Sequence, residues 1–303
     1  MLSSGIMNKS PLAWADEAIK FLYGLNEVPW LAPLIQQLPA QKELRALAAY
    51  ASKTTKERRE NGMVHGIDLF HFLAGEDQKD ANMQISHGDM DAENFVLSVI
   101  LTLIAGSDTV ASTLTFIFYQ LIKSPEIYKN LQAEVEHFRT SGSIDVKELA
   151  TLPWLNAIIN ETQRVMVVVP SRSQRIIGKG GAVILGEFLP AGTKISIPFQ
   201  TIMQDPRNFS PDPKGWRPSR WIDPSSELAF NPKAFIPFSY GAYNCAGKPL
   251  ALLEIRYLVT LFALSFDATF AEGFSCEEFE KSVLDRFTVQ IGKPLEVRLT
   301  VRE

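Results

Sequence analysis

The run FSYGAYNCAG, from Phe238 to Gly247, contains the residue on which the predicted fold and function of this chain depend, Cys245. It is followed at once by the strongly helical stretch PLALLEIRYLVTLFALSF. A glycine-containing loop that leads into a helix N-terminus supplies positive potential and hydrogen-bond donors, which favour a cysteine thiolate. Taken alone, a cysteine after a turn is more often an inert thiol, because free cysteine is among the most buried residue types.

Composition excludes several classes of protein. With 303 residues, 46% of them hydrophobic, and a net charge of -4, the chain is able to bury a large core. Its lysines and arginines are scattered, so we predict no nucleic-acid partner. The two cysteines, Cys245 and Cys276, are too few for a disulfide scaffold and lack the spacing of a zinc site. The histidines also lack ligand spacing; they are His65, His71, His87 and His137.

The first part of the chain, to about residue 173, is predicted to be mostly helical. Apolar residues recur at helical spacing in Pro29–Arg59, in the long run Phe95–Ile122, after Ser124 and Pro125, and again from near Leu152. The polar run over 76–91 predicts a surface loop before the long helix.

From residue 174 onwards the pattern changes to short strands and irregular segments. VILGEF and KISIP, within Gln174–Pro198, are β-rich stretches between glycine-containing turns and predict a small antiparallel sheet. Prolines crowd Asn208–Tyr240 and predict a long irregular segment. The alternating stretches FTVQIG and LEVRLTV predict a terminal hairpin. We therefore expect a mainly α chain with a small β portion, in one domain over residues 1–303.

The run from Phe95 to Ile122 has two interpretations. It is almost free of charge and exceeds the roughly 20 residues that cross a bilayer. Asp108 lies at its middle, however, and a carboxylate at mid-membrane is costly unless it faces a partner or water. We favour a long helix buried in the protein. The first residues carry neither a signal peptide nor a membrane anchor, so we expect no membrane span in this chain.

Further motifs accompany the cysteine run in a fixed order. Ala105–Thr109 reads AGSDT, Glu161–Arg164 reads ETQR, and Arg217–Trp221 reads RPSRW; the cysteine run itself follows Phe-x-x-Gly-x-x-x-Cys-x-Gly and is succeeded by Leu250–Glu254, LALLE. Together these motifs resemble those of the cytochrome P450 superfamily, and several stretches resemble fungal members. The resemblance runs from about residue 29 to the end of the chain and implies the C-terminal part of the cytochrome P450 fold.

This resemblance implies that Cys245 is the thiolate ligand of a haem b iron. A cysteine thiolate pushes electron density onto iron and favours cleavage of a bound O–O bond. Phe238 would pack near the sulfur, although simple core filling would place it there as well. Gly241 and Gly247 would shape the haem-binding loop.

The same resemblance indicates which residues lie near the haem propionates. Arg175 matches a position where relatives set an arginine against a propionate, an anion that the guanidinium fork suits, and Arg172 competes for this assignment. Tyr243 stands where relatives commonly have a basic residue, and Met203-Gln204 stand where a histidine is frequent. We expect these departures to weaken the electrostatic attraction for haem without removing the iron ligand.

Asp108 and Thr109 are the predicted catalytic residues. By resemblance, they provide an acid and a hydroxyl that relay protons to bound dioxygen, and Gly106 lets the helix open beside the iron. The alternative is a kinked core helix in which Thr109 bonds to its own backbone. The stretch alone leaves both interpretations open.

Glu161 and Arg164 are three residues apart on a predicted helix, so their side chains can meet. A solvated surface pair is the ordinary interpretation of such a spacing. In relatives, the corresponding pair joins an arginine of the proline-rich segment, here Arg220, in a charge network that holds the haem-binding region. We treat these three residues as structural and not catalytic.

The resemblance implies a monooxygenase that inserts one atom of dioxygen into a small organic substrate and receives electrons from an NADPH-dependent reductase. The alternative is an inactive or haem-incompetent fragment. Relatives have completed a membrane anchor, early helices and most of their main sheet where this resemblance begins, so we expect an N-terminally truncated chain. Relatives typically lie at the endoplasmic reticulum membrane, facing the cytosol; the sequence itself assigns no location.

Overall fold

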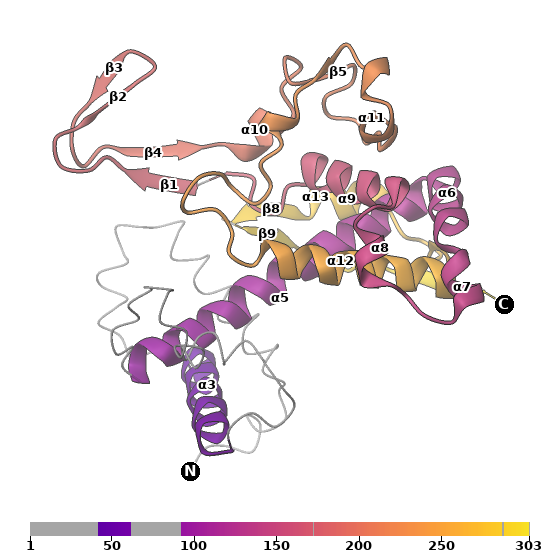
Figure 1. Cartoon of the computed structure of the whole chain (residues 1–303), viewed down its shortest axis with the longest axis horizontal. Helices are drawn as coiled ribbons and strands as arrows, with labels where there is room; N and C mark the ends of the chain where they lie inside the picture. The colour runs from indigo at the N-terminus through magenta and orange to yellow at the C-terminus, as the bar shows by residue number, and fades with distance from the viewer. Residues whose placement is uncertain (1–41, 62–91, 172, 287, 303) are drawn as a thin grey trace. The chain divides into compact units, whose positions relative to one another are not determined.

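The computed structural model describes residues 42–61, 92–171, 173–286 and 288–302 (Figure 1). The chain divides into two compact units, Met1–Asp108 and Thr109–Glu303. The first contains helix α3 (Lys42–Asn61) and the beginning of helix α5 (Ala92–Lys123). The start of the helix predicted from Pro29, the predicted loop 76–91, Arg172 and three of the histidines, His65, His71 and His87, lie outside the described residues.

The second unit contains the rest of α5, a set of further helices and five pairs of short strands. Its helices are α6 (Pro125–Val135), α7 (His137–Ser141), α8 (Val146–Leu149), α9 (Pro153–Val165), α10 (Phe199–Met203), α11 (Ser219–Ile222), α12 (Lys248–Ser265) and α13 (Cys276–Lys281), with short 3-10 turns η2 (Pro224–Ser226) and η3 (Pro232–Ala234). Its strands are β1 (Ser173–Ile176), β2 (Ala182–Ile184), β3 (Glu187–Leu189), β4 (Lys194–Ile197), β5 (Phe209–Ser210), β6 (Ala229–Phe230), β7 (Phe266–Phe270), β8 (Val283–Arg286), β9 (Thr288–Ile291) and β10 (Val297–Val301).

The main core lies where α5, α6, α9 and α12 pack together (Figure 1). Each helix contributes side chains that are fully removed from water, among them Ile117, Leu131, Leu155, Ile158 and Val259. Burying one such side chain contributes about 1.5–3 kcal/mol. The prediction of a mainly α chain with a small β portion is confirmed.

Helix α5 is buried over its C-terminal half. Phe116, Ile117 and Leu121 are at most 1% exposed, whereas Leu97 and Leu101 are 55% and 67% exposed. The prediction of a long buried helix therefore holds only for the half that packs in the second unit. Among the described residues, the stretch from Leu97 to Lys123 is long and apolar enough to cross a membrane, with a mean hydropathy of 1.5, but core helices of globular proteins meet the same criteria.

The C-terminal end of α5 is tied to α13 by a polar cluster. The Tyr119 hydroxyl donates to Glu280 at 2.5 Å, and the Lys123 ammonium lies 2.8 Å from the same carboxylate. Burial, together with the bond to Glu280, raises the pKa of Tyr119. Burial also raises the pKa of Glu280, but the bonds from Lys123 and Tyr119 outweigh it and lower this pKa overall. The cluster therefore keeps its tyrosine neutral and its carboxylate charged.

Helix α9 is placed by a carboxylate at its N-terminus. Pro153 occupies the first turn, where its missing N–H costs nothing. Glu134 of α6 accepts from the backbone N–H groups of Trp154 at 2.7 Å and Leu155 at 2.8 Å. These bonds satisfy two donors that have no partner within the helix, and the negative charge complements the helix dipole. The position of α9 matters because it carries Glu161.

The strands after residue 172 confirm the predicted small antiparallel sheet but differ from it in detail. Strand β1 pairs antiparallel with β4, and β2 pairs antiparallel with β3. VILGEF, predicted to be a β-rich stretch, contributes to two strands, β2 and β3. It folds back on itself at Leu185 and Gly186, both of which have positive φ angles, 54° and 88°.

The predicted terminal hairpin is wrong. Strand β9, from the stretch FTVQIG, pairs with the preceding β8, and β10, from LEVRLTV, pairs with β7 directly after α12. Both strands alternate as predicted, but a local alternation does not specify the pairing partner.

Candidate functional site

The loop that carries Cys245 is held in shape by backbone hydrogen bonds. The Cys245 N–H donates to the Phe238 carbonyl at 2.9 Å, which closes the loop, and the Asn244 N–H donates to the Gly241 carbonyl at 3.1 Å. Gly241 has a φ of +88°, a conformation that glycine adopts without strain. The predicted role of Gly241 in shaping the loop therefore has a physical reason, and Phe238 and Cys245 are brought together.

The sulfur lies at the N-terminal end of α12. Gly247 is the residue that precedes this 18-residue helix, and the Ala251 N–H donates to its carbonyl at 2.9 Å. A Cβ atom added at Gly247 would lie 3.8 Å from the sulfur. The sulfur thus lies beside the positive end of the helix dipole.

The Cys245 thiol is accessible to solvent. Cys245 is exposed, and so is each residue from Gly241 to Leu250. The interpretation as an inert buried thiol is therefore wrong. A thiol that is exposed, held on a closed loop and placed at a helix N-terminus fits the requirements of an axial haem ligand.

Glu161, Arg164 and Arg220 lie together in the core, each with a side chain that is 0% exposed. The Arg164 guanidinium donates to both oxygens of Glu161 at 2.8 Å, and Arg220 Nε donates to Glu161 Oε1 at 3.0 Å. The alternative of a solvated surface pair is thus wrong.

Glu161 also accepts bonds from the segment that surrounds Arg220. The Arg217 backbone N–H and the Trp221 indole N–H each donate to it at 2.9 Å. The remaining donors of Arg164 bond to backbone carbonyls of Met203, Pro213 and Gly215. A buried charge is tolerated only when such bonds replace its lost hydration.

Glu227 is a further member of this network that the sequence did not reveal. Its side chain is 0% exposed, and it accepts from Arg220 at 2.9 Å and from Arg217 at 2.7 Å. It balances the buried charge, because two carboxylates now face the two fully buried guanidinium groups. The short polar run around it carries no motif that would have marked it.

Trp221 connects this charge network to the cysteine loop, which is the loop over residues 238–247 that carries Cys245. Its indole N–H bonds to Glu161, and its ring lies 4.7 Å from the ring of Phe235, in edge-to-face contact. Phe235 is three residues before Phe238, whose carbonyl accepts the Cys245 N–H. The network therefore supports the segment that leads into the loop.

Trp221→Phe tests this connection. The ring packing persists, but Glu161 loses a buried donor, which lowers the free energy of unfolding by about 1.5–3 kcal/mol. Urea denaturation followed by circular dichroism measures this change, and hydrogen exchange at the Cys245 amide is expected to become faster. Trp154→Phe is the control, because Trp154 is half-buried and its indole N–H donates to none of the described residues. Equal effects of the two substitutions would contradict the assigned bond.

Comparison with protein families identifies the chain. The family model described as Cytochrome P450 matches residues 20–292. The chain belongs to the cytochrome P450 superfamily. Cytochrome P450 monooxygenase nodW of Hypoxylon pulicicidum is 36% identical over 248 residues, which cover 81% of this chain and 44% of that protein. Cytochrome P450 67 of Uromyces fabae is 31% identical over 287 residues, with coverages of 91% and 51%.

A solved structure shows the same fold. The cytochrome P450DA haem domain superposes with a TM-score of 0.78 over 97% of this chain and 61% of its own, at 20% sequence identity. The predicted cytochrome P450 fold is thus confirmed. Cytochrome P450 monooxygenase phqL of Penicillium fellutanum is 31% identical over 298 residues, which cover 51% of that protein. The chain spans about half the length of the curated relatives it matches.

In this cytochrome P450 chain, Asp108 and Thr109 occupy adjacent half-buried positions of α5. Asp108 ends the first compact unit and Thr109 begins the second. The helix continues through Gly106, and a Cβ atom there would meet nothing within 4 Å. The hydroxyls of Ser107 and Thr113 bond to carbonyls four residues earlier, at 2.7 and 2.8 Å. The proton-relay role of Asp108 and Thr109 stays a prediction.

Arg175 lies on strand β1 with an exposed side chain. Its guanidinium donates to the Gln174 carbonyl at 2.9 Å. Phe238 is half-buried, and the Lys248 ammonium lies 5.7 Å from the centre of its ring. The propionate assignment of Arg175 and the haem contact of Phe238 stay predictions.

The positions that depart from the family pattern have other contacts. Tyr243 is 83% exposed on the cysteine loop. Met203 is buried and its carbonyl binds Arg164, while the Gln204 amide donates to the Val165 carbonyl at 2.8 Å. Met203 and Gln204 thus help to hold the end of α9.

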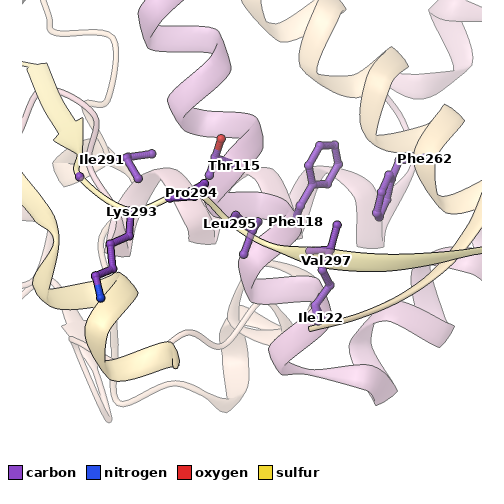
Figure 2. A pocket seen from close by; sticks show the side chains of 10 residues that line it. Thr115, Phe118, Ile122, Phe262, Ile291, Lys293, Pro294, Leu295 and Val297 are labelled. Atoms are coloured by element: carbon purple, nitrogen blue, oxygen red, sulfur yellow. The ribbon is translucent and has the colours of Figure 1, made fainter. Parts of the chain in front are cut away.

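Among the described residues, neither His137 nor the groove beside α5 provides a second candidate site for a metal or a cofactor. His137 lies 3.0 Å from Glu148, and no cluster of three or more metal-ligating side chains occurs among the described residues. The groove, of about 560 Å³, lies between α5, α12 and the segment that joins β9 to β10 (Figure 2). Its lining contains no residue of the cysteine loop; it includes Thr115, Phe118, Phe262, Lys293 and Leu295.

Proposed function

We propose that this chain is the haem-binding part of a monooxygenase that inserts one atom of dioxygen into a small organic substrate. The observation that carries this proposal is the exposed Cys245 thiol, held on a closed glycine loop at the N-terminus of α12. Membership of the cytochrome P450 superfamily supports it, as do the names of nodW and phqL, both of which are cytochrome P450 monooxygenases.

Cys245 would hold a haem b iron through its sulfur. Haem b, when bound, supplies the site at which dioxygen is activated. Phe238 would pack beside the sulfur, and Gly241 and Gly247 keep the loop clear of side chains. The Arg175 guanidinium would bind a propionate, since its planar fork suits a carboxylate.

The remaining residues position the site and move protons. The Asp108 carboxyl and the Thr109 hydroxyl transfer protons toward the reacting oxygen, which is general acid catalysis. Glu161, Arg164 and Arg220 do not touch the reacting atoms. They hold the segment that ends in the cysteine loop, and so keep the Cys245 sulfur in place.

Three further molecules take part in the proposed reaction. They are the small organic substrate, dioxygen and an NADPH-dependent reductase that delivers electrons. The net charge of -4 and the scattered basic residues give no reason to add a nucleic acid.

Isotopically labelled dioxygen tests the reaction directly. The haem-loaded chain, a fungal NADPH-dependent reductase and a panel of small lipophilic compounds are incubated together, and products are analysed by mass spectrometry. We expect products that carry one labelled oxygen atom, and at least about 100-fold less product from Asp108→Asn. Label-free products, or no product from a chain that has bound haem, would overturn the proposal and favour an inactive fragment.

A further inference from the structure

Helix α12 has apolar side chains on two opposite sides, and the described chain covers only one of them. The inner side contributes Ile255, Val259 and Ala263 to the main core, each at most 1% exposed. The outer side carries a stripe of apolar side chains that are 40% to 51% exposed; they are Leu250, Leu253, Tyr257, Leu258 and Leu261. A helix that is apolar all round is normally buried within a protein. This outer stripe therefore marks a surface that a partner covers.

The outer stripe runs along the helix with one charged residue beside it. From Leu250 to Leu261 its members follow mostly at intervals of three or four residues, so they share one face over about 17 Å. Glu254 is exposed beside them. Arg256 points the other way and donates to Asn156 of α9 at 2.8 Å. Single exposed apolar residues are ordinary, but a contiguous row of them marks an interaction surface.

We propose that the outer stripe is a dimer interface, at which α12 packs antiparallel against α12 of a second copy of this chain. A two-fold axis close to Tyr257 then sets Leu253 of each copy against Leu261 of the other. Such an interface needs only one kind of surface, because each copy offers the same face. The proposal is independent of haem binding and of the proposed reaction.

The charges on α12 favour the antiparallel arrangement. Lys248, exposed at the first position of the helix, comes to lie beside the C-terminal end of the second α12, where the helix dipole favours a cation. The two Glu254 carboxylates are separated by six residues along the axis, or about 9 Å. Salt screens exposed charges over a similar distance, about 8–10 Å. A parallel pairing would instead set the two carboxylates side by side.

The surface next to the stripe enlarges the interface. A specific dimer buries about 800 Å² on each partner, which is more than one row of side chains provides. Leu258 stands one turn before Phe262, which lines the groove of about 560 Å³ between α5 and α12 (Figure 2). Phe118, Ile122 and Leu295 also line this groove. The stripe and the groove thus form one continuous apolar surface, and the interface extends from the first into the second.

A second copy fits this surface better than a lipid bilayer does. Helices that lie on bilayers are rich in lysine and arginine on the polar face that borders their apolar face. In α12 the exposed residue beside the stripe is Glu254, which lipid phosphates would repel. Lys248 stands at the end of the helix and not along the stripe.

Sedimentation equilibrium of the full chain at micromolar concentrations measures the association. We expect a mass of two chains. Leu253→Gln combined with Leu261→Gln is expected to raise the dissociation constant by at least about 30-fold. Leu284→Gln is the control, because Leu284 is 43% exposed, against 42% for each stripe leucine, but lies on β8. Circular dichroism checks that the variants are folded. A parent chain that sediments as a single copy would overturn the proposal, and so would equal effects of the stripe and control variants.

Cross-linking through single cysteines measures the direction of the pairing. Cys245 and Cys276 are replaced by alanine, and either Tyr257→Cys or Leu250→Cys is added. With copper phenanthroline as catalyst, dioxygen takes two electrons and two protons from a pair of thiols, and one disulfide bond forms.

We expect a cross-linked dimer from Tyr257→Cys, because the two-fold axis brings the two sites together. Leu250→Cys is expected to cross-link much more slowly, since its two sites lie about 21 Å apart along the axis. Equal cross-linking of the two variants would overturn the antiparallel pairing. A dimer that cross-links at neither position would show that another face of the chain forms the interface.

Discussion

Glu161→Gln is expected to lower the free energy of unfolding of the second unit by about 3–5 kcal/mol. The substitution keeps the size of the side chain but removes one of two buried negative charges. Arg220 would keep its pairing with Glu227, but the fully buried Arg164 would lose the carboxylate with which it pairs. The indole N–H of Trp221 would also face a weaker acceptor. Urea denaturation followed by circular dichroism measures the loss.

Glu126→Gln is the matched control. Glu126 also pairs with a cation three residues later, Lys129, at 3.4 Å, but the two side chains are 87% and 71% exposed. Exposed pairs contribute at most about 1 kcal/mol, so this substitution is expected to change stability by less than that. Similar losses from the two variants would mean that burial does not distinguish the Glu161 network from a surface pair.

Cys245→Ala is expected to weaken haem binding by at least about tenfold and to abolish oxygen insertion. The substitution removes the only proposed protein ligand of the iron and leaves the loop backbone intact, because the bond from residue 245 to Phe238 is made by the amide. Optical titration with haem measures the affinity.

Cys276→Ala is the control for this second prediction. Cys276 is the other cysteine of the chain and lies on α13, half-buried and away from the loop in sequence. We expect this variant to bind haem as the parent chain does. If both variants bound haem with the parent affinity, Cys245 would not be the ligand.

The charge network shows what short motifs predict well. The spacing of Glu161 and Arg164 places both side chains on one helix face, and the family resemblance added Arg220. All three are found together and fully buried. Glu227 was missed because its contacts depend on how an irregular proline-rich segment folds back, and no periodic pattern encodes such a path.

The β-rich part shows where local patterns are insufficient. Alternation predicted strands in the tail correctly, but their partners, β7 and β8, are set by the length and direction of the elements between them. VILGEF contains a turn at Leu185-Gly186, where the run of apolar side chains concealed the glycine that allows the chain to reverse.

Helix α5 shows that composition alone does not determine burial. Both halves of its sequence are predominantly apolar, yet Phe116 and Ile117 are buried while Leu97 and Leu101 are exposed. Burial follows the packing of α6, α9 and α12 against the C-terminal half of the helix, which a hydropathy pattern does not contain.

The most direct test of thiolate ligation is the absorption spectrum of the haem-loaded chain, reduced and then exposed to carbon monoxide. Because the Cys245 sulfur is exposed at the N-terminus of α12, we expect a strongly red-shifted Soret band that is absent from Cys245→Ala and retained in Cys276→Ala. A Soret band without this shift, or a shifted band that persists in Cys245→Ala, would contradict the assignment of Cys245 as the haem ligand.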